Sequence, residues 1–168
     1  LTGKTRIESD LIGAREIPAE ALYGVQTLRG IENFSISKFR LSEYPLFIKG
    51  LAITKMAAAM ANFELGLLTV EQKDAIIAAC GEILDGKHHD QFPVDMIQGG
   101  AGTTTNMNAN EVIANRALEL MGHERGEYQY CSPNDHVNCS QSTNDAYPTA
   151  IHIGMYFKHL QLLPHLEE

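Results

Sequence analysis

The sequence predicts a mainly α-helical protein with a small irregular or β element near its N-terminus. Three observations support this fold class: long runs of strong helix formers, apolar stripes at helical spacing, and glycines where those runs end. The chain has 168 residues, 44% of them hydrophobic and 20% charged, which is enough to bury one core. This composition excludes a disordered chain, a collagen and a mini-protein held by disulfides.

The charge, the hydropathy and the cysteines of the chain indicate which classes of partner and which compartment to expect. The chain carries 13 basic and 21 acidic side chains, for a net charge of −8. Nucleic-acid binders usually present a basic face, so we expect no nucleic-acid partner. No uninterrupted apolar run approaches the ~20 residues that span a bilayer, so we expect no membrane partner. The 3 cysteines form no CxxC pair, which favours free thiols in a reducing cytoplasm.

The N-terminal part contains short extended segments separated by turn residues. Gly13 and Pro18 are turn signals, and short extended pieces are expected around Arg6–Asp10 and Arg15–Ile17. Residues 28–44 are polar and aperiodic, so no element is predicted there.

Two helices are predicted in the middle of the chain. Leu46–Leu65 is rich in Ala, Met, Leu and Ile and is apolar most of the way round, which predicts a largely buried helix ended by Gly66. Thr69 and Gln72 have the spacing of a capping box, and Gly86 ends the helix that follows it. The apolar stripe of this second helix consists of Ile76, Ala79, Cys80, Ile83 and Leu84.

Two further helices are predicted after a loop that contains Pro93. One runs from about Thr105 to Met121, and residues 122–143 after it are irregular. The last helix begins near Asn144 or Pro148 and runs toward the end of the chain. Pro164 lies inside it, which predicts a kink or an early stop.

The loop before the third helix has the composition of an anion site. It lies in Gly99–Glu111, where glycines let backbone N–H groups approach a ligand and the helix N-terminus adds positive potential. Thr103–Thr105 add hydroxyl groups, and Asn106 and Asn110 share a helix face. A simple capping turn explains the same composition about equally well. The pattern matches neither common nucleotide-binding loop.

The loop before the last helix has similar chemistry. Within Pro133–Asp145, the residues Ser142, Thr143 and Asn144 offer hydroxyl and amide groups just before a helix. Ordinary N-capping is the alternative explanation. Two such loops together could bind the two negatively charged ends of a small dianion.

The remaining polar residues are candidates for metal ligands or for a general base, and they give weaker signals than the two loops. His88, His89, Asp90 and Asp95 lack a regular ligand spacing, so neither a metal nor a cofactor is expected. His136 is a candidate general base, although a loop histidine more often serves as a hydrogen-bonding or surface residue.

The two loops resemble, in order and separation, the two signature regions of the aspartase/fumarase superfamily. The matching regions are Gly99–Val112 and Pro133–Asp145, and the resemblance extends from about Arg6 to the end. Fumarases carry SSND in the second region, and a histidine of a second anion site where this chain has Ser132. The motifs with the aspartase form are DQFPVD at 90–95, QGGAG at 98–102, GEYQY at 126–130 and QSTND at 141–145.

The resemblance implies a fold and an assembly. Residues 1–142 would form the N-terminal lyase domain, and residues 143–168 the first helix, cut short, of a central helix bundle. Members are homotetramers whose active sites draw on three subunits. Thr103 and Thr143 therefore need not lie close together within one chain.

The resemblance also implies a reaction, the reversible anti-elimination of ammonia from L-aspartate to give fumarate. The family's base is a serine in a GSSxMPxKxN-like loop that this chain does not contain, so no catalytic residue is assigned and the chain alone is expected to be inactive. The alternatives are a fumarate hydratase, another lyase of the superfamily, or a helical interaction module without catalysis. By motif match, the substrate-binding residues are Thr103, Asn106, Ser142, Thr143 and Asn144, with Thr104 and Asn108 beside them.

Overall fold

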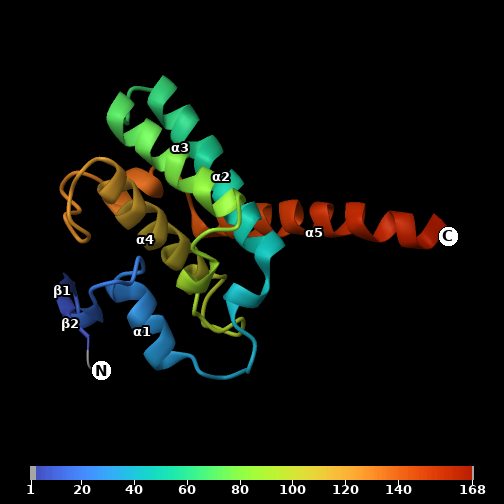
Figure 1. The fold of residues 1–168 in the computed structure, drawn as a ribbon, viewed down its shortest axis with the longest axis horizontal. Coiled ribbons are helices and arrows are strands. Elements are labelled where there is room, and N and C mark those ends of the chain that lie inside the picture. Colours follow the sequence, from blue (N-terminus) through green and yellow to red (C-terminus); the bar gives the residue numbers. More distant parts are fainter. Residues whose placement is uncertain (1–2, 168) are drawn as a thin grey trace.

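The structure, a computed structural model, describes residues 3–167 as a mainly helical fold with an N-terminal hairpin. Four helices and the hairpin form one body, and the fifth helix extends away from it (Figure 1). The helices are α1 (Val25–Asn33), α2 (Pro45–Glu64), α3 (Val70–Leu84), α4 (Thr103–Leu120) and α5 (Thr143–Glu167).

The hairpin pairs β1 (Thr5–Asp10) with β2 (Gly13–Pro18) in antiparallel register. The strands are longer than the short extended pieces that the sequence predicts. Asp10 lies opposite Gly13 at the turn. Its carboxylate accepts the N–H of Gly13 at 3.2 Å and two hydrogen bonds from Arg29 at 2.8 Å, which attach the turn to α1.

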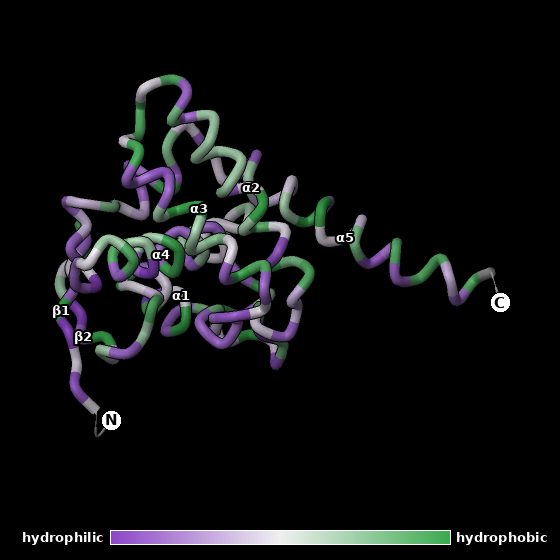
Figure 2. The backbone as a smooth tube through the Cα atoms, turned by 45° about the horizontal axis from the view of Figure 1, so that its top comes forward, coloured by the Kyte–Doolittle hydropathy of each residue, from purple (hydrophilic) through white to green (hydrophobic). Residues whose placement is uncertain are grey.

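The core lies where α2 packs against α3 and α5 and where α3 packs against α4. Figure 2 shows hydrophobic residues concentrated where these helices meet. By length and composition α2 could also cross a membrane, with a mean hydropathy of 1.3 over the most apolar window. Its contacts with α3 and α5 explain this hydropathy, because a central core helix has the same composition.

Local signals place α2 and α3 correctly. The capping box is confirmed: the Thr69 hydroxyl accepts the Gln72 N–H, and the Gln72 side chain accepts the Thr69 N–H, both at 3.1 Å. Gly66 follows α2 with φ +73°, a conformation that ends helices and favours glycine.

Two predictions about helix position are wrong. α1 (Val25–Asn33) overlaps the stretch where no element is predicted, because its N-terminal cap comes from distant residues. α5 continues through Pro164 to Glu167, so the early stop is wrong. Pro164 cannot donate a hydrogen bond to the carbonyl of Leu160, and Leu160 is exposed in this chain.

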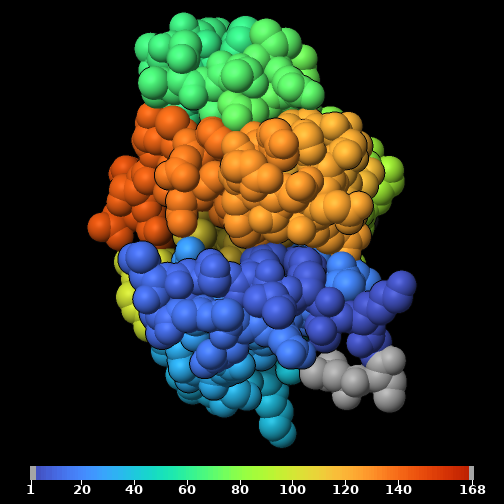
Figure 3. Space-filling view, turned by 90° about the vertical axis from the view of Figure 1, so that its left-hand side faces the viewer, coloured from blue at the N-terminus to red at the C-terminus, as the bar shows by residue number. Residues whose placement is uncertain are grey.

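The connection between α4 and α5 covers one face of the body. Figure 3 shows this orange segment between the blue N-terminal part and the green end of α2 and α3. It is irregular, as predicted, except for a π-helical turn at Pro133–Val137. Because it packs against α2 and α4, this segment sets the direction in which α5 begins.

Candidate functional site

The glycine-rich turn leads directly into α4, as predicted. Gly102 immediately precedes the helix with φ +86°. A Cβ atom built there would lie 2.2 Å from Cδ2 of Tyr147 on α5. Two features therefore require glycine at this position: the positive φ and the close approach of α5.

Gln98 caps the start of α4. Its Oε1 accepts the Thr105 N–H, and its Nε2 donates to the Thr105 hydroxyl, both at 2.8 Å. The Thr105 hydroxyl is therefore committed to the cap. Thr104 packs against Gly30 of α1, whereas Thr103 is exposed. Of the three neighbouring threonines, Thr103 is the one whose side chain faces solvent.

The second loop likewise leads into a helix, as predicted. Ser142 and Asn144 are exposed and Thr143 is half-buried at the start of α5. The Ser142 hydroxyl accepts the Asn144 N–H at 3.1 Å, and its carbonyl accepts the N–H groups of Asp145 at 3.1 Å and Ala146 at 3.0 Å. Ser142 thus occupies the N-cap position, and the exposed hydroxyl and amide groups lie at the positive end of α5.

The two helix starts meet. The buried Asn106 side chain of α4 donates from Nδ2 to the Thr143 hydroxyl oxygen at 3.2 Å and to Asn138 Oδ1 at 3.0 Å. The starts of α4 and α5 therefore meet within one chain, through Asn106 and not through the pair Thr103 and Thr143 that the expectation names. As an acceptor from Asn106, the Thr143 hydroxyl keeps its own proton free to donate to a ligand.

The asparagines of α4 differ in their surroundings. Asn106 faces the second loop, whereas Asn108 donates to the carbonyl of Gln91 at 3.0 Å. Both side chains are buried, and their Oδ1 atoms have no hydrogen-bond partner among residues 3–167. The structure thus brings Asn106 to the second loop and does not show Asn108 in contact with it.

Lys55 is a polar residue of this region that the sequence reasoning missed. It is fully buried on α2, and its ammonium donates to Asn138 Oδ1 at 2.9 Å and to Gln141 Oε1 at 3.0 Å. Burial lowers the pKa of this ammonium to about 7. The sequence contains one signal for this residue, because a lysine inside a helix that is apolar most of the way round is expected to be buried.

The residues that contact Lys55 shape the loop before α5. Gln141 donates from Nε2 to the carbonyls of Val137 at 2.8 Å and Cys139 at 3.1 Å, and Asn138 donates from Nδ2 to the Gln141 carbonyl at 3.1 Å. Ser140 adopts φ +57° within this turn. The turn is thus closed by its own side chains around the lysine head group.

His136 serves as a hydrogen-bonding residue. Its Nδ1 accepts the Ser132 N–H at 2.7 Å, and burial lowers its pKa, which favours the neutral ring. The Ser132 hydroxyl accepts the Asp135 N–H at 3.1 Å and so caps the π-helical turn.

The four residues considered as metal ligands have separate partners. His88 contacts Glu82 at 2.7 Å, and Asp95 accepts hydrogen bonds from the loop at 36–37. Within residues 3–167, no group of three or more His, Cys, Asp or Glu side chains is placed to hold a metal ion.

A buried carboxylate supports the opposite side of α4. Glu111 accepts the N–H groups of Gly24 and Gln26 at 2.8 Å and of Thr27 at 3.0 Å, which caps α1. Glu8 accepts the Val25 N–H at 3.1 Å beside it. Burial raises the Glu111 pKa, and the backbone N–H groups oppose that shift. These contacts attach α1 and the hairpin to the helix that carries Asn106.

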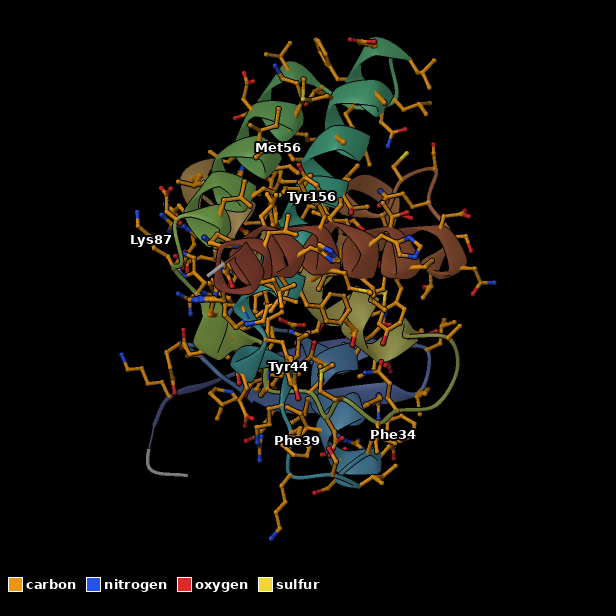
Figure 4. The ribbon with its side chains drawn as sticks, turned by 90° about the vertical axis from the view of Figure 1, so that its right-hand side faces the viewer. Phe34, Phe39, Tyr44, Met56, Lys87 and Tyr156 are labelled. Carbon is orange, nitrogen blue, oxygen red and sulfur yellow. The ribbon has the colours of Figure 1, made fainter. Side chains whose placement is uncertain are left out.

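An apolar surface remains exposed along α5. A cavity of about 660 Å³ lies between the start of α2 and α5 and is lined by Tyr44, Phe47 and Tyr147, among others. Tyr44 immediately precedes α2, and Tyr156 lies on α5; both are labelled in Figure 4. The exposed apolar side chains of α5 are Met155, Tyr156, Leu160, Leu162, Leu163 and Leu166.

Comparison with known sequences identifies several close relatives. The chain is 64% identical over 151 residues to the aspartate ammonia-lyase of Helicobacter pylori, covering 90% of this chain and 32% of that protein. It is 58% identical over 164 residues to the aspartate ammonia-lyase of Escherichia coli, covering 97% and 34%. The chain thus spans about a third of the length of these relatives.

Solved structures show the same fold. Fumarate lyase:delta crystallin from Brucella melitensis superposes with a TM-score of 0.96 at 52% identity, over 98% of this chain and 36% of that one. The class II fumarase of Schistosoma mansoni gives a TM-score of 0.84 at 39% identity, over 90% and 32%. A family model described as Lyase matches residues 13–168. With its two donor-rich helix starts and this match over most of its length, the chain belongs to the lyase family.

Proposed function

We propose that this chain acts within an ammonia-lyase that converts L-aspartate reversibly to fumarate and ammonia. The observation that carries the proposal is the contact between Asn106 and Thr143, which joins two donor-rich helix starts. The identity of 58% and 64% to two aspartate ammonia-lyases supports the choice of substrate.

The reaction needs hydrogen-bond donors aimed at a carboxylate. A proton leaves the carbon next to a carboxylate, and the resulting aci-carboxylate carries additional negative charge. Donors that are already oriented stabilise this charge without reorganisation. In our proposal the start of α5 supplies them, because the hydroxyls of Ser142 and Thr143 and the Asn144 amide lie at its positive end.

The site residues have different roles in this proposal. Ser142, Thr143 and Asn144 bind the carboxylate, and Thr103 contributes from the exposed start of α4. Asn106 orients Thr143 by donating to its hydroxyl oxygen. A neutral hydroxyl without an activating partner is a poor base, so we assign proton removal to a residue outside these 168.

We further propose that residues 143–168 belong to a central helix bundle of a homotetramer and that residues 1–142 form the N-terminal domain. The exposed apolar side chains along α5 support the bundle, because a solvent-exposed helix rarely carries such a surface unpartnered. The free thiols of Cys80, Cys131 and Cys139 support a cytoplasmic location.

A chimera tests the proposed function. This chain replaces the matching segment of the E. coli aspartate ammonia-lyase, to which it is 58% identical, and fumarate formation is followed by ultraviolet absorbance. Thr143→Ala is expected to lower the rate roughly a hundredfold or more, since one oxyanion donor contributes about 3–4 kcal/mol. Thr149→Ala, an exposed position on the same helix, is the matched control and should leave the rate unchanged.

The outcomes separate the alternatives. Fumarate formed from L-malate instead of L-aspartate would assign a hydratase. A chimera that binds no dicarboxylate would favour the interaction module. An unimpaired Thr143→Ala chimera would remove Thr143 from the site.

A further inference from the structure

The ammonium of Lys55 is buried behind the loop that begins α5. Its two hydrogen-bond acceptors, Asn138 Oδ1 and Gln141 Oε1, are neutral amide oxygens. Within residues 3–167 no carboxylate forms an ion pair with it, although other lysines and arginines of the chain have such partners. The positive charge is therefore held by dipoles and has no counter-ion in the described part of the chain.

The neighbouring ionisable group does not balance this charge. Cys80 on α3 is the group whose charge would act on Lys55, and burial raises the pKa of its thiol to about 12. The thiol is neutral at physiological pH. A buried cation without an anion is unfavourable, because no counter-charge offsets the loss of its hydration. An anion that arrives nearby would recover part of that cost.

Two chains of contacts lead from Lys55 to the candidate site. Asn138 Oδ1 accepts from both Lys55 and Asn106, and Asn106 in turn donates to Thr143. Gln141 accepts from Lys55 and immediately precedes Ser142 in the chain. Both residues that bind the ammonium therefore also set the position of the hydroxyl groups.

We propose that Lys55 is a positioning residue of this site, whose ammonium holds residues 138–141 so that Ser142 and Thr143 face the ligand and whose charge balances a bound carboxylate. The proposal rests on the proposed function, because it assumes that a dicarboxylate occupies the starts of α4 and α5. It assigns to Lys55 no contact with the substrate and no proton transfer in the reaction.

A pH dependence of binding follows from this arrangement. A bound carboxylate favours the charged ammonium, so binding and proton uptake by Lys55 are linked. Because burial lowers the pKa of the free ammonium to about 7, the KM for L-aspartate should rise as pH increases from 7 to 9. Cys80 stays neutral over that range and does not contribute.

The first test is Lys55→Met in the chimera with the E. coli enzyme. We expect the KM for L-aspartate at pH 7 to rise about tenfold or more, the size of one lost charge-assisted interaction, with a smaller fall in kcat. The rise of KM between pH 7 and 9 should disappear. Lys49→Met is the matched control, because it removes one lysine from the same helix at a half-buried position away from the loop.

The second test adds a counter-ion at the cost of one hydrogen bond, from Asn138 Nδ2 to the Gln141 carbonyl. Asn138→Asp preserves the acceptor at 2.9 Å from the ammonium and supplies the missing negative charge. We expect an unchanged or higher melting temperature together with a raised KM. Loss of the Nδ2 hydrogen bond alone would raise the KM at every pH, whereas the added counter-ion keeps Lys55 charged and also abolishes the rise of KM between pH 7 and 9. The variant is informative even where Lys55→Met fails to fold.

The results distinguish this inference from the function on which it rests. An unsubstituted chimera that forms no fumarate refutes the proposed function and the inference with it. The role of Lys55 alone is overturned when the active, unsubstituted chimera has a KM that does not vary between pH 7 and 9, or when the Asn138→Asp variant keeps that variation.

Discussion

Replacing Gly102 by alanine should destabilise the junction between α4 and α5 by about 2–5 kcal/mol. The residue has φ +86°, and an L side chain in that conformation costs about 1–2 kcal/mol. The new Cβ would also lie 2.2 Å from Cδ2 of Tyr147, which forces the ring to move, and overpacking of this kind costs about 1–3 kcal/mol.

A double-mutant cycle separates the two contributions. In a Tyr147→Ala background the ring is gone, so Gly102→Ala should cost only the conformational part, about 1–2 kcal/mol. Tyr147→Ala has its own cost, because the ring packs edge-on against Phe47 with centroids 5.5 Å apart. The coupling energy of the cycle should be about 1–3 kcal/mol.

Urea unfolding of the 168-residue chain, followed by circular dichroism, measures these values. Gly66→Ala is the matched control, because Gly66 has φ +73° and nothing lies within 4 Å of the position that its Cβ would take. If Gly102→Ala costs no more than Gly66→Ala, or if the coupling energy is near zero, α4 and α5 do not meet as described.

Two other substitutions test the charged groups that hold α4. Glu111→Gln should lower the free energy of unfolding by about 2–4 kcal/mol, because at least one of the three backbone N–H groups that Glu111 accepts at the start of α1 would then face an amide donor. An unchanged melting temperature would contradict the cap. Hydrogen bonds from Arg116 lower the pKa of Glu82 from 4.5 to about 2. Its contribution is therefore present above pH 4.5 and is lost as the pH falls toward 2. Relative to Glu82→Gln, the chain should lose about 1–2 kcal/mol over that range, after allowing for solvent screening; parallel stability curves would refute the assignment.

Local sequence signals predict the elements whose ends are determined locally. The capping box of Thr69 and Gln72 and the terminating Gly66 lie within a few residues of the helices that they define. α1 was missed for the opposite reason. Its N-cap residue, Gly24, has no side chain, and its capping groups come from Glu8 and Glu111, the latter 87 residues away in sequence from Gly24. No pattern within one helix encodes such a cap.

In the candidate site, too, local sequence predicts some features, whereas others depend on contacts across the fold. The polar residues at the helix starts, Thr103 and Ser142–Asn144, follow from composition next to a helix signal. The contact between the two helix starts does not, because it is a hydrogen bond from Asn106 to Thr143, two residues 37 apart in the sequence. The buried charge of Lys55 depends on contacts between residues far apart in the sequence, at separations of 83 and 86.

The buried asparagines of α4 differ in how fully their amide groups are paired. Asn106, Asn108, Asn110 and Asn115 are all buried, and the first three each have an Oδ1 atom without a partner among residues 3–167. An unpaired buried amide oxygen costs about 1–3 kcal/mol, so apolar side chains there would favour folding. Asn115 is different, because both of its amide groups are paired and it has an evident structural role. Asn106 combines an unpaired oxygen with a hydrogen bond to Thr143. Under the proposed function, the orientation of the Thr143 hydroxyl at the start of α5 accounts for the burial of this amide.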